Sequence, residues 1–174
     1  ATTLADYCYS GMFQECTGLE SAPELPATTL ANYCYYRMFY GCTSLTSAKK
    51  LPATTLADYC YSGMFQECTG LESAPELPAI TLAPRCYSYM FNGCTSLSSV
   101  TMLAPSDQIT NKRDCCYYWL TDAGTKEGIS RTLQVKNADA YTALKNNTAN
   151  YYLPDNWQIG KCTVLAGDNS TITE

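Results

Sequence analysis

The chain repeats itself with a period of 26 residues, and no other feature constrains its fold as strongly. Repeat one (residues 1–26) and repeat three (residues 53–78) are identical at every position. Repeat two (residues 27–52) follows the same plan, and repeat four (residues 79–104) follows it more loosely. Units this short cannot bury an apolar face alone, so the sequence predicts that neighbouring repeats stack and share one core.

Apolar side chains recur every four residues in the first half of each repeat. In repeat one they are Leu4, Cys8, Met12 and Cys16. This spacing predicts the inward face of a short helix or of a pair of turns, and Gly11 argues against one long helix. Thr3 followed by Asp6 resembles a capping box, which favours a helix start at this point.

The second half of each repeat predicts a short extended segment. Its inward residues in repeat one are Leu19, Ala22 and Leu25. Pro23 limits ladder pairing within the segment, and stacked segments are expected about 4.8 Å apart in a parallel sheet. Because repeats one and three are identical, we expect Leu19→Ala and Leu71→Ala to cost the same, about 2–4 kcal/mol. The period fits one coil of a leucine-rich repeat, so the predicted fold class is an α/β solenoid of short parallel strands and short helices or turns.

A degenerate fifth repeat, residues 105–130, follows repeat four. Cys115 and Trp119 fall where Cys86 and Met90 fall, after an insertion of three residues. The repeat array is therefore predicted to cover residues 1–130.

Residues 131–174 depart from the repeat pattern and are predicted to form a C-terminal cap. The expected elements are a strand at 132–136, a helix at 138–146 with Asn137 as N-cap, and a last strand at 162–166. Tyr141 and Leu144 are expected to be buried by the helix, and Trp157 and Ile159 to seal the last coil.

The repeat unit, TxLAxYCYxxMFxxCTSLxSAxxLPATT, resembles the BspA-like leucine-rich repeats of bacterial surface proteins. The resemblance covers residues 1–104 strongly and 105–130 weakly, and the ending, from TLQVK to Leu153–Trp157, resembles the C-terminal caps of that family. The resemblance implies a curved right-handed coil, export, and attachment to proteins or surfaces, with no catalytic residues to transfer. The chain departs from the pattern at Lys49 and Lys50, which replace a Pro-Glu pair, and at Pro84, which replaces an Asp or Asn.

The charge and composition of the chain exclude several kinds of function. The net charge is −5, whereas binding to nucleic-acid phosphates requires a basic face. The chain has no histidine, which excludes Ser-His-Asp and Cys-His catalysis and histidine-based zinc sites. No apolar run is long enough to span a membrane. Acid–base pairs such as Glu15 with Glu20, or Asp107 with Asp114, lie in repeat or loop positions, so we expect no enzyme, cofactor or metal site.

Charged side chains alternate in sign along the repeats. The series Glu24, Lys50 and Glu76 predicts an exposed ladder worth a few tenths of a kcal/mol per pair. The alternative is a solvated face with mobile side chains.

Eleven cysteines are present, and nine of them fall in two regular columns. The columns are Cys8, Cys34, Cys60, Cys86 and Cys115, and Cys16, Cys42, Cys68 and Cys94. These inward positions favour reduced, buried thiols that act as small apolar side chains. Cys115 and Cys116 are adjacent and are not expected to face inward together, so one of them is predicted to be reactive or bridged.

Fifteen tyrosines make the chain rich in a residue that is common in binding surfaces. Two regular columns are expected to pack between repeats. Three tyrosines occur only in the even repeats and are candidate binding residues: Tyr36, Tyr40 and Tyr89. They predict an adhesive surface for protein or glycan, and the alternative is simple packing between repeats.

A second candidate surface is the outward row of the predicted sheet. It comprises Ser21, Pro23, Ser47, Lys49, Ser73, Pro75, Ser99 and Thr101. The row is small and polar and suits an extended partner, but nothing in it specifies one.

These patterns, with the resemblance, predict a non-catalytic binding or adhesion module at a cell surface or outside the cell. The expected partner is a protein or glycan, on a host or neighbouring cell, and neither nucleic acid nor membrane insertion is expected. The alternative is a structural part of a larger assembly, such as a filament or a phage tail fibre, in which repeats stack end to end. The array starts in phase at Ala1, so we also expect further protein upstream.

Overall fold

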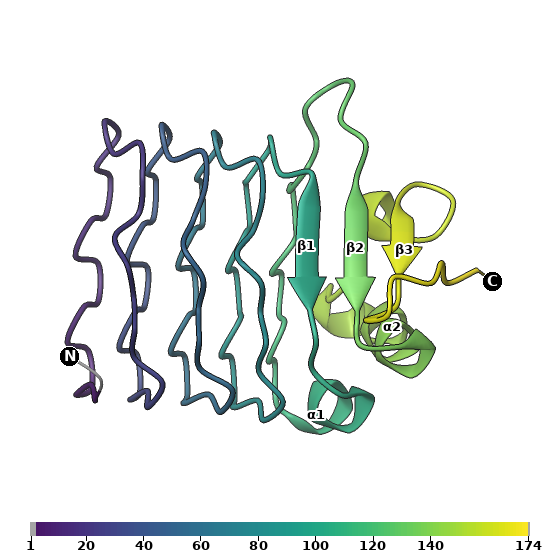
Figure 1. Ribbon diagram of the computed structural model, residues 1–174, viewed down its shortest axis with the longest axis horizontal. Helices are drawn as coiled ribbons and strands as arrows, with labels where there is room; N and C mark the ends of the chain where they lie inside the picture. The colour runs from purple at the N-terminus through teal and green to yellow at the C-terminus, as the bar shows by residue number, and fades with distance from the viewer. Residues whose placement is uncertain (1–2, 174) are drawn as a thin grey trace.

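The computed structural model describes residues 3–173, and its backbone is mostly irregular (Figure 1). The regular part is one parallel sheet in the order β1 (Ser99–Met102), β2 (Thr132–Val135) and β3 (Thr163–Leu165), with two short helices, α1 (Ser106–Asn111) and α2 (Ala138–Asn146). Two 3-10 turns, η1 (Thr148–Asn150) and η2 (Asp155–Trp157), complete it. None of the helices in residues 3–173 is long and apolar enough to cross a membrane. The leucine-rich coil stays a prediction, because the regular elements amount to this small sheet and these helices.

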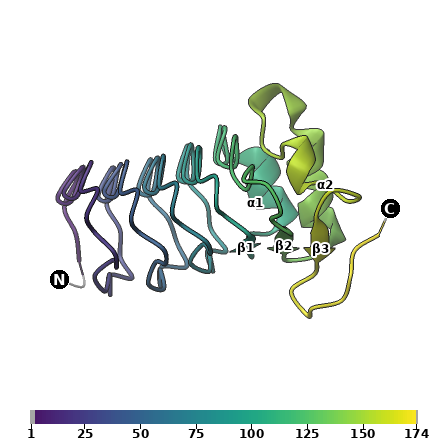
Figure 2. The same cartoon turned by 90° about the horizontal axis from the view of Figure 1, so that it is seen from above.

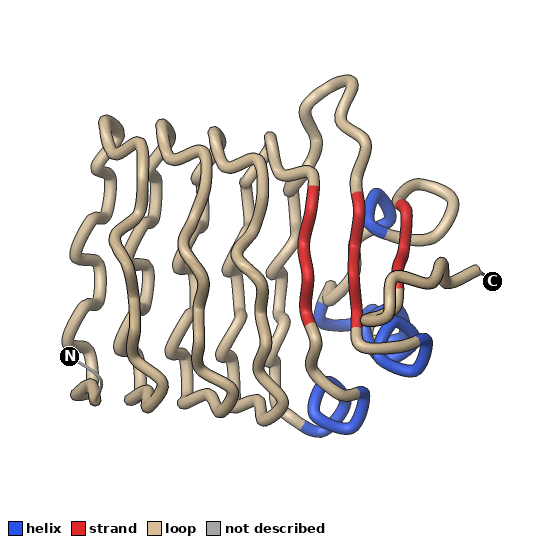
Figure 3. The backbone as a smooth tube through the Cα atoms, viewed as in Figure 1, coloured by secondary structure: helices blue, strands red, loops and turns tan. Residues whose placement is uncertain are grey.

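Consecutive repeats nevertheless lie side by side along the long axis of the molecule, as the tube in Figure 3 shows. The N–H groups of Tyr7 and Tyr9 donate to carbonyl oxygens of Asn32 and Cys34 in the next repeat, at 3.0 and 2.9 Å. Equivalent bonds join repeats two, three and four. The backbone groups of each repeat are thus satisfied largely by its neighbours, as buried backbone requires.

The first half of each repeat forms consecutive turns. Alternate N–H groups donate to the next repeat, and those between them donate three residues back, as from Cys8 to Ala5 and from Ser10 to Tyr7. Every fourth residue is left-handed: Tyr7, Gly11 and Glu15, then Tyr33, Arg37 and Gly41, Tyr59, Gly63 and Glu67, and Arg85, Tyr89 and Gly93. Of the two structures predicted for this segment, the turns are confirmed and the helix is wrong, because a left-handed residue interrupts a right-handed helix.

Asp6 and its equivalents connect repeats instead of capping helices. Asp6 Oδ1 accepts a hydrogen bond from Asn32 N at 3.0 Å, and Asn32 Oδ1 accepts one from Asp58 N at 3.1 Å. Pro84 follows in the series and has no N–H to donate, so the series ends there. The capping box predicted from Thr3 and Asp6 is therefore wrong.

The second half of each repeat is extended and pairs through single parallel bridges. Ser21 pairs with Ser47, Ser47 with Ser73, and Ser73 with Ser99 at the start of β1. Beyond β1 the pairing lengthens into a continuous ladder, with Val100 opposite Leu133. The prolines in the earlier segments withhold donors, which limits the pairing there to bridges.

The three-residue insertion before the fifth repeat is visible in the backbone bonding. Tyr59 N donates to Pro84 O, whereas the equivalent Arg85 N donates to Arg113 O, three residues further along the chain. Phe91 N correspondingly donates to Trp119 O. The backbone hydrogen bonds between repeats four and five therefore agree with the three-residue insertion inferred from the sequence.

The elements predicted after residue 131 are confirmed. β2 and β3 lie within the predicted strands, and α2 spans the predicted helix with Asn137 as its N-cap, whose side chain accepts from Ala140 N at 3.0 Å. The side chains of Tyr141, Leu144 and Trp157 are buried, while Ile159 is half-buried. In the view of Figure 2, α1 and α2 lie on the side of the sheet along which the turns run.

The core consists of side chains that stack in register from repeat to repeat. Phe13, Phe39, Phe65 and Phe91 form a ladder with ring centroids 5.5, 5.4 and 5.8 Å apart. Tyr35, Tyr61 and Tyr87 form a second buried ladder. Offset parallel rings of this kind add to the gain from burial.

Cysteine has a polar role in this core as well as an apolar one. The thiols of Cys42 and Cys68 donate to the carbonyl oxygens of Phe13 and Phe39 in the preceding repeat, at 3.1 and 3.0 Å. All eleven cysteines are free, and burial raises the pKa of Cys42 to about 11. The cysteines of repeat one, Cys8 and Cys16, are exposed, so burial is not common to every column member.

Cys115 and Cys116 both lie in the core, which corrects the expectation that only one of them faces inward. Both are fully buried and neither is bridged. The expectation assumed a strand, whereas these residues lie in the turn segment of the fifth repeat. There, adjacent side chains both point into the core, as Cys86 and Tyr87 do in repeat four.

The predicted ladder of Glu24, Lys50 and Glu76 is wrong. Within residues 3–173 the ion pairs are those of Asp114 with Arg85 and Arg113, and all three ladder residues are exposed. Ion pairs between exposed long side chains contribute little stability in water, which agrees with the alternative prediction of a solvated face with mobile side chains.

Candidate ligand-binding site

The predicted serine row forms an uneven surface. Ser21, Ser47 and Ser73 are exposed and joined by backbone bridges, and Ser99 is half-buried at the start of β1. Pro23 and Lys49 are also exposed. Their two counterparts in repeats three and four differ, because Pro75 is buried and the Thr101 hydroxyl bonds to Gln134 Oε1 at 3.2 Å. The structure thus removes Pro75 from the predicted binding row and leaves a run of small exposed hydroxyls.

The turn segments carry a ladder of partly exposed tyrosines. Tyr7, Tyr33 and Tyr59 stack with centroids 4.6 and 4.4 Å apart. Arg85 follows in the fourth repeat, with its guanidinium carbon 5.7 Å from the centre of the Tyr59 ring. This places a cation at the end of an aromatic ladder, where the ring quadrupole favours it.

The three candidate tyrosines of the even repeats are half-buried and divide into two groups. Tyr36 and Tyr40 flank Arg37, whose guanidinium carbon lies 5.3 and 5.4 Å from their ring centres. Tyr89 lies two repeats further along and stacks on Tyr118 at 5.7 Å. The structure therefore brings Tyr36 and Tyr40 together around one arginine and separates Tyr89 from them by one repeat.

A pocket of about 130 Å³ lies between these two groups, over repeat three. Its lining residues come from repeats two, three and four: Tyr36, Arg37, Tyr59, Ser62, Gly63, Gln66, Arg85, Ser88 and Tyr89. The pocket exists because repeat three has Ser62 and Gly63 where repeat two has Tyr36 and Arg37. Small residues between two repeats with large ones leave the depression. Tyr40 is not part of the lining.

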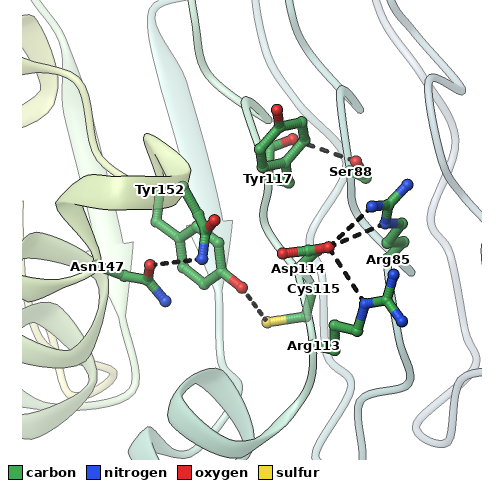
Figure 4. Close-up of polar contacts among 9 residues, drawn as sticks. Arg85, Ser88, Arg113, Asp114, Cys115, Tyr117, Asn147 and Tyr152 are labelled. Atoms are coloured by element: carbon green, nitrogen blue, oxygen red, sulfur yellow. Dashed lines mark hydrogen bonds and ion pairs between the residues drawn. The ribbon is translucent and has the colours of Figure 1, made fainter.

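The two arginines of the pocket differ in their partners. Arg85 Nη2 and Nε both lie 3.0 Å from Asp114 Oδ2, and Arg113 approaches the same oxygen at 3.6 Å (Figure 4). Burial opposes the charge of Arg85, but hydrogen bonds from it to Asp114 and Tyr59 outweigh this and raise its pKa. Among the described residues Arg37 makes no ion pair, so its charge faces the pocket unneutralised.

Four large side chains of the pocket have left-handed backbone: Arg37, Tyr59, Arg85 and Tyr89. Arg37 has φ 50° and Tyr89 has φ 56°, in a column where repeats one and three have Gly11 and Gly63. A left-handed residue other than glycine costs about 1–2 kcal/mol. Large side chains held where glycine is the unstrained choice are typical of functional positions.

Gln66 supplies a buried acceptor at the base of the pocket. Its Nε2 donates to Asn92 Oδ1 at 3.0 Å, whereas its Oε1 is buried and has no hydrogen-bond partner. Gly63 lies directly above, since a Cβ at this glycine would come within 3.2 Å of that oxygen and 3.0 Å of Arg37 Cγ. Unpaired buried oxygens are rare, so this one is a ready acceptor for a hydroxyl donor.

Sequence reasoning found Tyr36 and Tyr89 but missed Arg37, Gly63, Gln66 and Arg85. One signal was present in the alternation of glycine with a large residue along one column of the repeats. It is invisible in any single repeat and becomes informative only when the turn geometry shows that this column is left-handed.

The described residues offer neither a metal site nor a catalytic cluster of cysteines. Residues 3–173 contain no group of three or more acidic or cysteine side chains placed to hold a metal ion. Cys115 Sγ lies 3.7 Å from Tyr152 Oη (Figure 4), and hydrogen bonding from Cys116 lowers the pKa of Cys115 although burial acts the other way. Both thiols are fully buried, so this pair is out of reach of a substrate.

Comparison of the chain with protein families, with curated proteins and with solved structures finds no match.

Proposed function

We propose that this chain is a non-catalytic binding module that holds a protein or glycan ligand in the pocket between Arg37 and Tyr89. The observation that carries the proposal is the pocket itself, framed by an arginine and a tyrosine that stand in a column where the neighbouring repeats have glycine. Tyrosine and arginine are the side chains most enriched at binding hot spots. The proposal includes a location at a cell surface or outside the cell, which rests on the resemblance to bacterial surface proteins.

The proposed fold behind this module is a stack of leucine-rich repeat coils over residues 1–130, closed by a cap at 131–174. It is supported by the backbone bonds between successive repeats and by the aromatic ladders. A stack of this kind places equivalent residues of successive repeats in columns, so a binding surface is assembled from several repeats.

A panel of immobilised glycans and purified surface proteins tests the function. We expect saturable binding to at least one ligand, weakened by Gly63→Ala, because the added Cβ meets Arg37 Cγ at 3.0 Å. Gly11→Ala is the matched control, since Gly11 has nearly the same φ (62° against 61°) and lies outside the pocket. Absence of saturable binding, or equal weakening by both changes, contradicts the proposal.

A second candidate function, a structural part of a larger assembly, is favoured by the exposed face of repeat one. Tyr7 and Met12 are 58% and 57% exposed, whereas the identical Met64 in repeat three is fully buried. A further repeat of this kind, from any chain, would cover these side chains. Sedimentation over a range of concentrations tests this: reversible assembly lost on Met12→Lys supports it, and a monomer at all concentrations contradicts it.

A further inference from the structure

We propose that the pocket takes an anionic saccharide, a pyranose ring bearing a carboxylate or a sulfate, with the anion on Arg37 and the ring on Tyr89. This inference rests on the proposed binding function and names the chemical class of its ligand. It follows from three features of the pocket: an unneutralised cation, an aromatic face and a buried acceptor.

The chain has a net charge of −5, yet the lining of the pocket has two arginines and no acidic side chain. Asp114 neutralises part of the charge of Arg85, whereas the guanidinium of Arg37 lies against the rings of Tyr36 and Tyr40 and makes no ion pair among the described residues. A guanidinium offers two parallel donors to a carboxylate or sulfate. Arg37 therefore selects an anionic group.

The aromatic face comes from Tyr89. Tyr118 stacks on one side of its ring with planes 9° apart, and the column continues on the other side to Gly63, which has no side chain. Arg37 lies one repeat beyond Gly63. Two repeat spacings of about 4.8 Å place the backbones of Arg37 and Tyr89 about 10 Å apart. This leaves room for one sugar ring on the tyrosine once the Arg37 side chain, which lies against Gly63, turns toward the anion. The pocket volume of about 130 Å³ suits one sugar ring and is too small for a longer segment of an oligosaccharide.

The buried acceptor fits a hydroxyl-rich ligand. Gln66 Oε1 has no hydrogen-bond partner, and this oxygen and the stem of Arg37 both approach the position of a Cβ at Gly63, at 3.2 and 3.0 Å. When Arg37 turns toward an anion, a sugar hydroxyl beside it gains access to this oxygen and donates to it. A ligand without hydroxyl donors leaves the oxygen unpaired, which is costly in a buried site.

The test measures binding of 3′-sialyllactose, a sulfated disaccharide and neutral lactose to the purified chain by ligand-observed NMR and calorimetry. We expect at least one of the two acidic sugars to bind about tenfold or more tightly than lactose, as one charge-assisted hydrogen bond predicts, and its binding to weaken as salt is raised. Comparison of the two acidic sugars shows whether the anion is a carboxylate or a sulfate. Free acetate and sulfate are included to show whether the anion alone suffices.

Two variants separate the outcomes. Arg37→Gly, which restores the glycine of repeats one and three, is expected to abolish the preference for acidic sugars while the protein stays folded. Gly63→Ala is expected to weaken binding of all sugars, and Gly11→Ala is expected to leave it unchanged. If Arg37→Gly keeps the preference, or if lactose binds as well as the acidic sugars, the inference is overturned. Saturable binding of a protein or neutral glycan that Gly63→Ala removes would leave the binding function standing without it.

Discussion

Repeats one and three have the same 26 residues and different surroundings. In repeat three, which has a repeat on either side, Cys60, Met64 and Leu71 are fully buried. In repeat one, with a repeat on one side within the described residues, Cys8 is exposed and Met12 is 57% exposed. The comparison separates what a repeat specifies by itself from what its neighbours supply.

Both repeats adopt the same local backbone, with left-handed residues at equivalent positions: Tyr7, Gly11 and Glu15, and Tyr59, Gly63 and Glu67. The turn geometry is therefore a property of the repeat sequence. Burial is a property of the stack, because one repeat has too little apolar surface to form a core. Identical substitutions in the two repeats should then differ in cost, and each pair of substitutions below measures one part of that difference.

The largest difference is expected for the leucine pair. Leu71 is fully buried and Leu19 is half-buried, so Leu71→Ala should lower the free energy of unfolding by about 2–5 kcal/mol and Leu19→Ala by distinctly less. The equal costs expected from sequence identity are corrected by this difference in burial. Urea unfolding followed by circular dichroism measures both. Equal costs would show that the two repeats are packed alike.

A glycine pair tests close approach between neighbouring repeats. A Cβ at Gly70 would overlap the carbonyl oxygen of Thr43 in repeat two, whereas one at Gly18 meets nothing within 4 Å. Gly70→Ala should cost about 1–3 kcal/mol, since backbone must shift, and Gly18→Ala should change stability by less than about 0.5 kcal/mol. Thermal unfolding of both variants gives the comparison, and a harmless Gly70→Ala would place Thr43 elsewhere.

A cysteine pair tests burial through the pH dependence of stability. Burial, and then the nearby Cys86 and Cys34 thiols, raise the pKa of Cys60 well above its unfolded value of about 8.5. The stabilisation of the folded state by the protonated Cys60 thiol is fully present at pH values below this unfolded-state pKa. That contribution falls by about 1.4 kcal/mol per pH unit above it, because only the unfolded chain then loses the proton.

Replacing the buried thiol should remove this contribution to the slope. We expect Cys60→Ala to make the dependence of the unfolding free energy on pH less steep between about pH 9 and pH 11, and Cys8→Ala, at the exposed equivalent position, is the matched control. Urea titrations at several pH values measure the slopes. A change of slope in Cys8→Ala equal to that in Cys60→Ala would contradict the difference in burial.

Much of the fold could be predicted because repetition and periodicity are visible in the sequence. The strand at Thr132–Val135 and the helix capped by Asn137 followed from short local patterns. Of the short helix and the pair of turns expected in each repeat, the turns were right, and the sequence could not choose between them because a four-residue period suits both. Nothing in the pattern distinguishes them except the glycines, and tyrosine, arginine and glutamate occupy the other left-handed positions.

The candidate site was only partly predictable. Tyr36 and Tyr89 stood out because they occur only in the even repeats, but the roles of Arg37 and Gly63 follow only from their places in three adjacent repeats. The serine row was predicted from alternation alone, which does not reveal that Pro75 is buried. Sequence patterns give the direction of a side chain more readily than the space left around it.

Site-by-site labelling of native cysteines tests the central claim, that identical repeats are buried or exposed according to their neighbours. The protein is alkylated at neutral pH, then unfolded and digested with trypsin. Cleavage after Arg37, Lys50 and Arg85 places Cys8 and Cys60 in different peptides, so mass spectrometry separates the two repeats. The structure predicts that Cys8 and Cys16 react on the order of a hundredfold faster than Cys60 and Cys68, which must first open locally. Equal rates at the four thiols would contradict the claim.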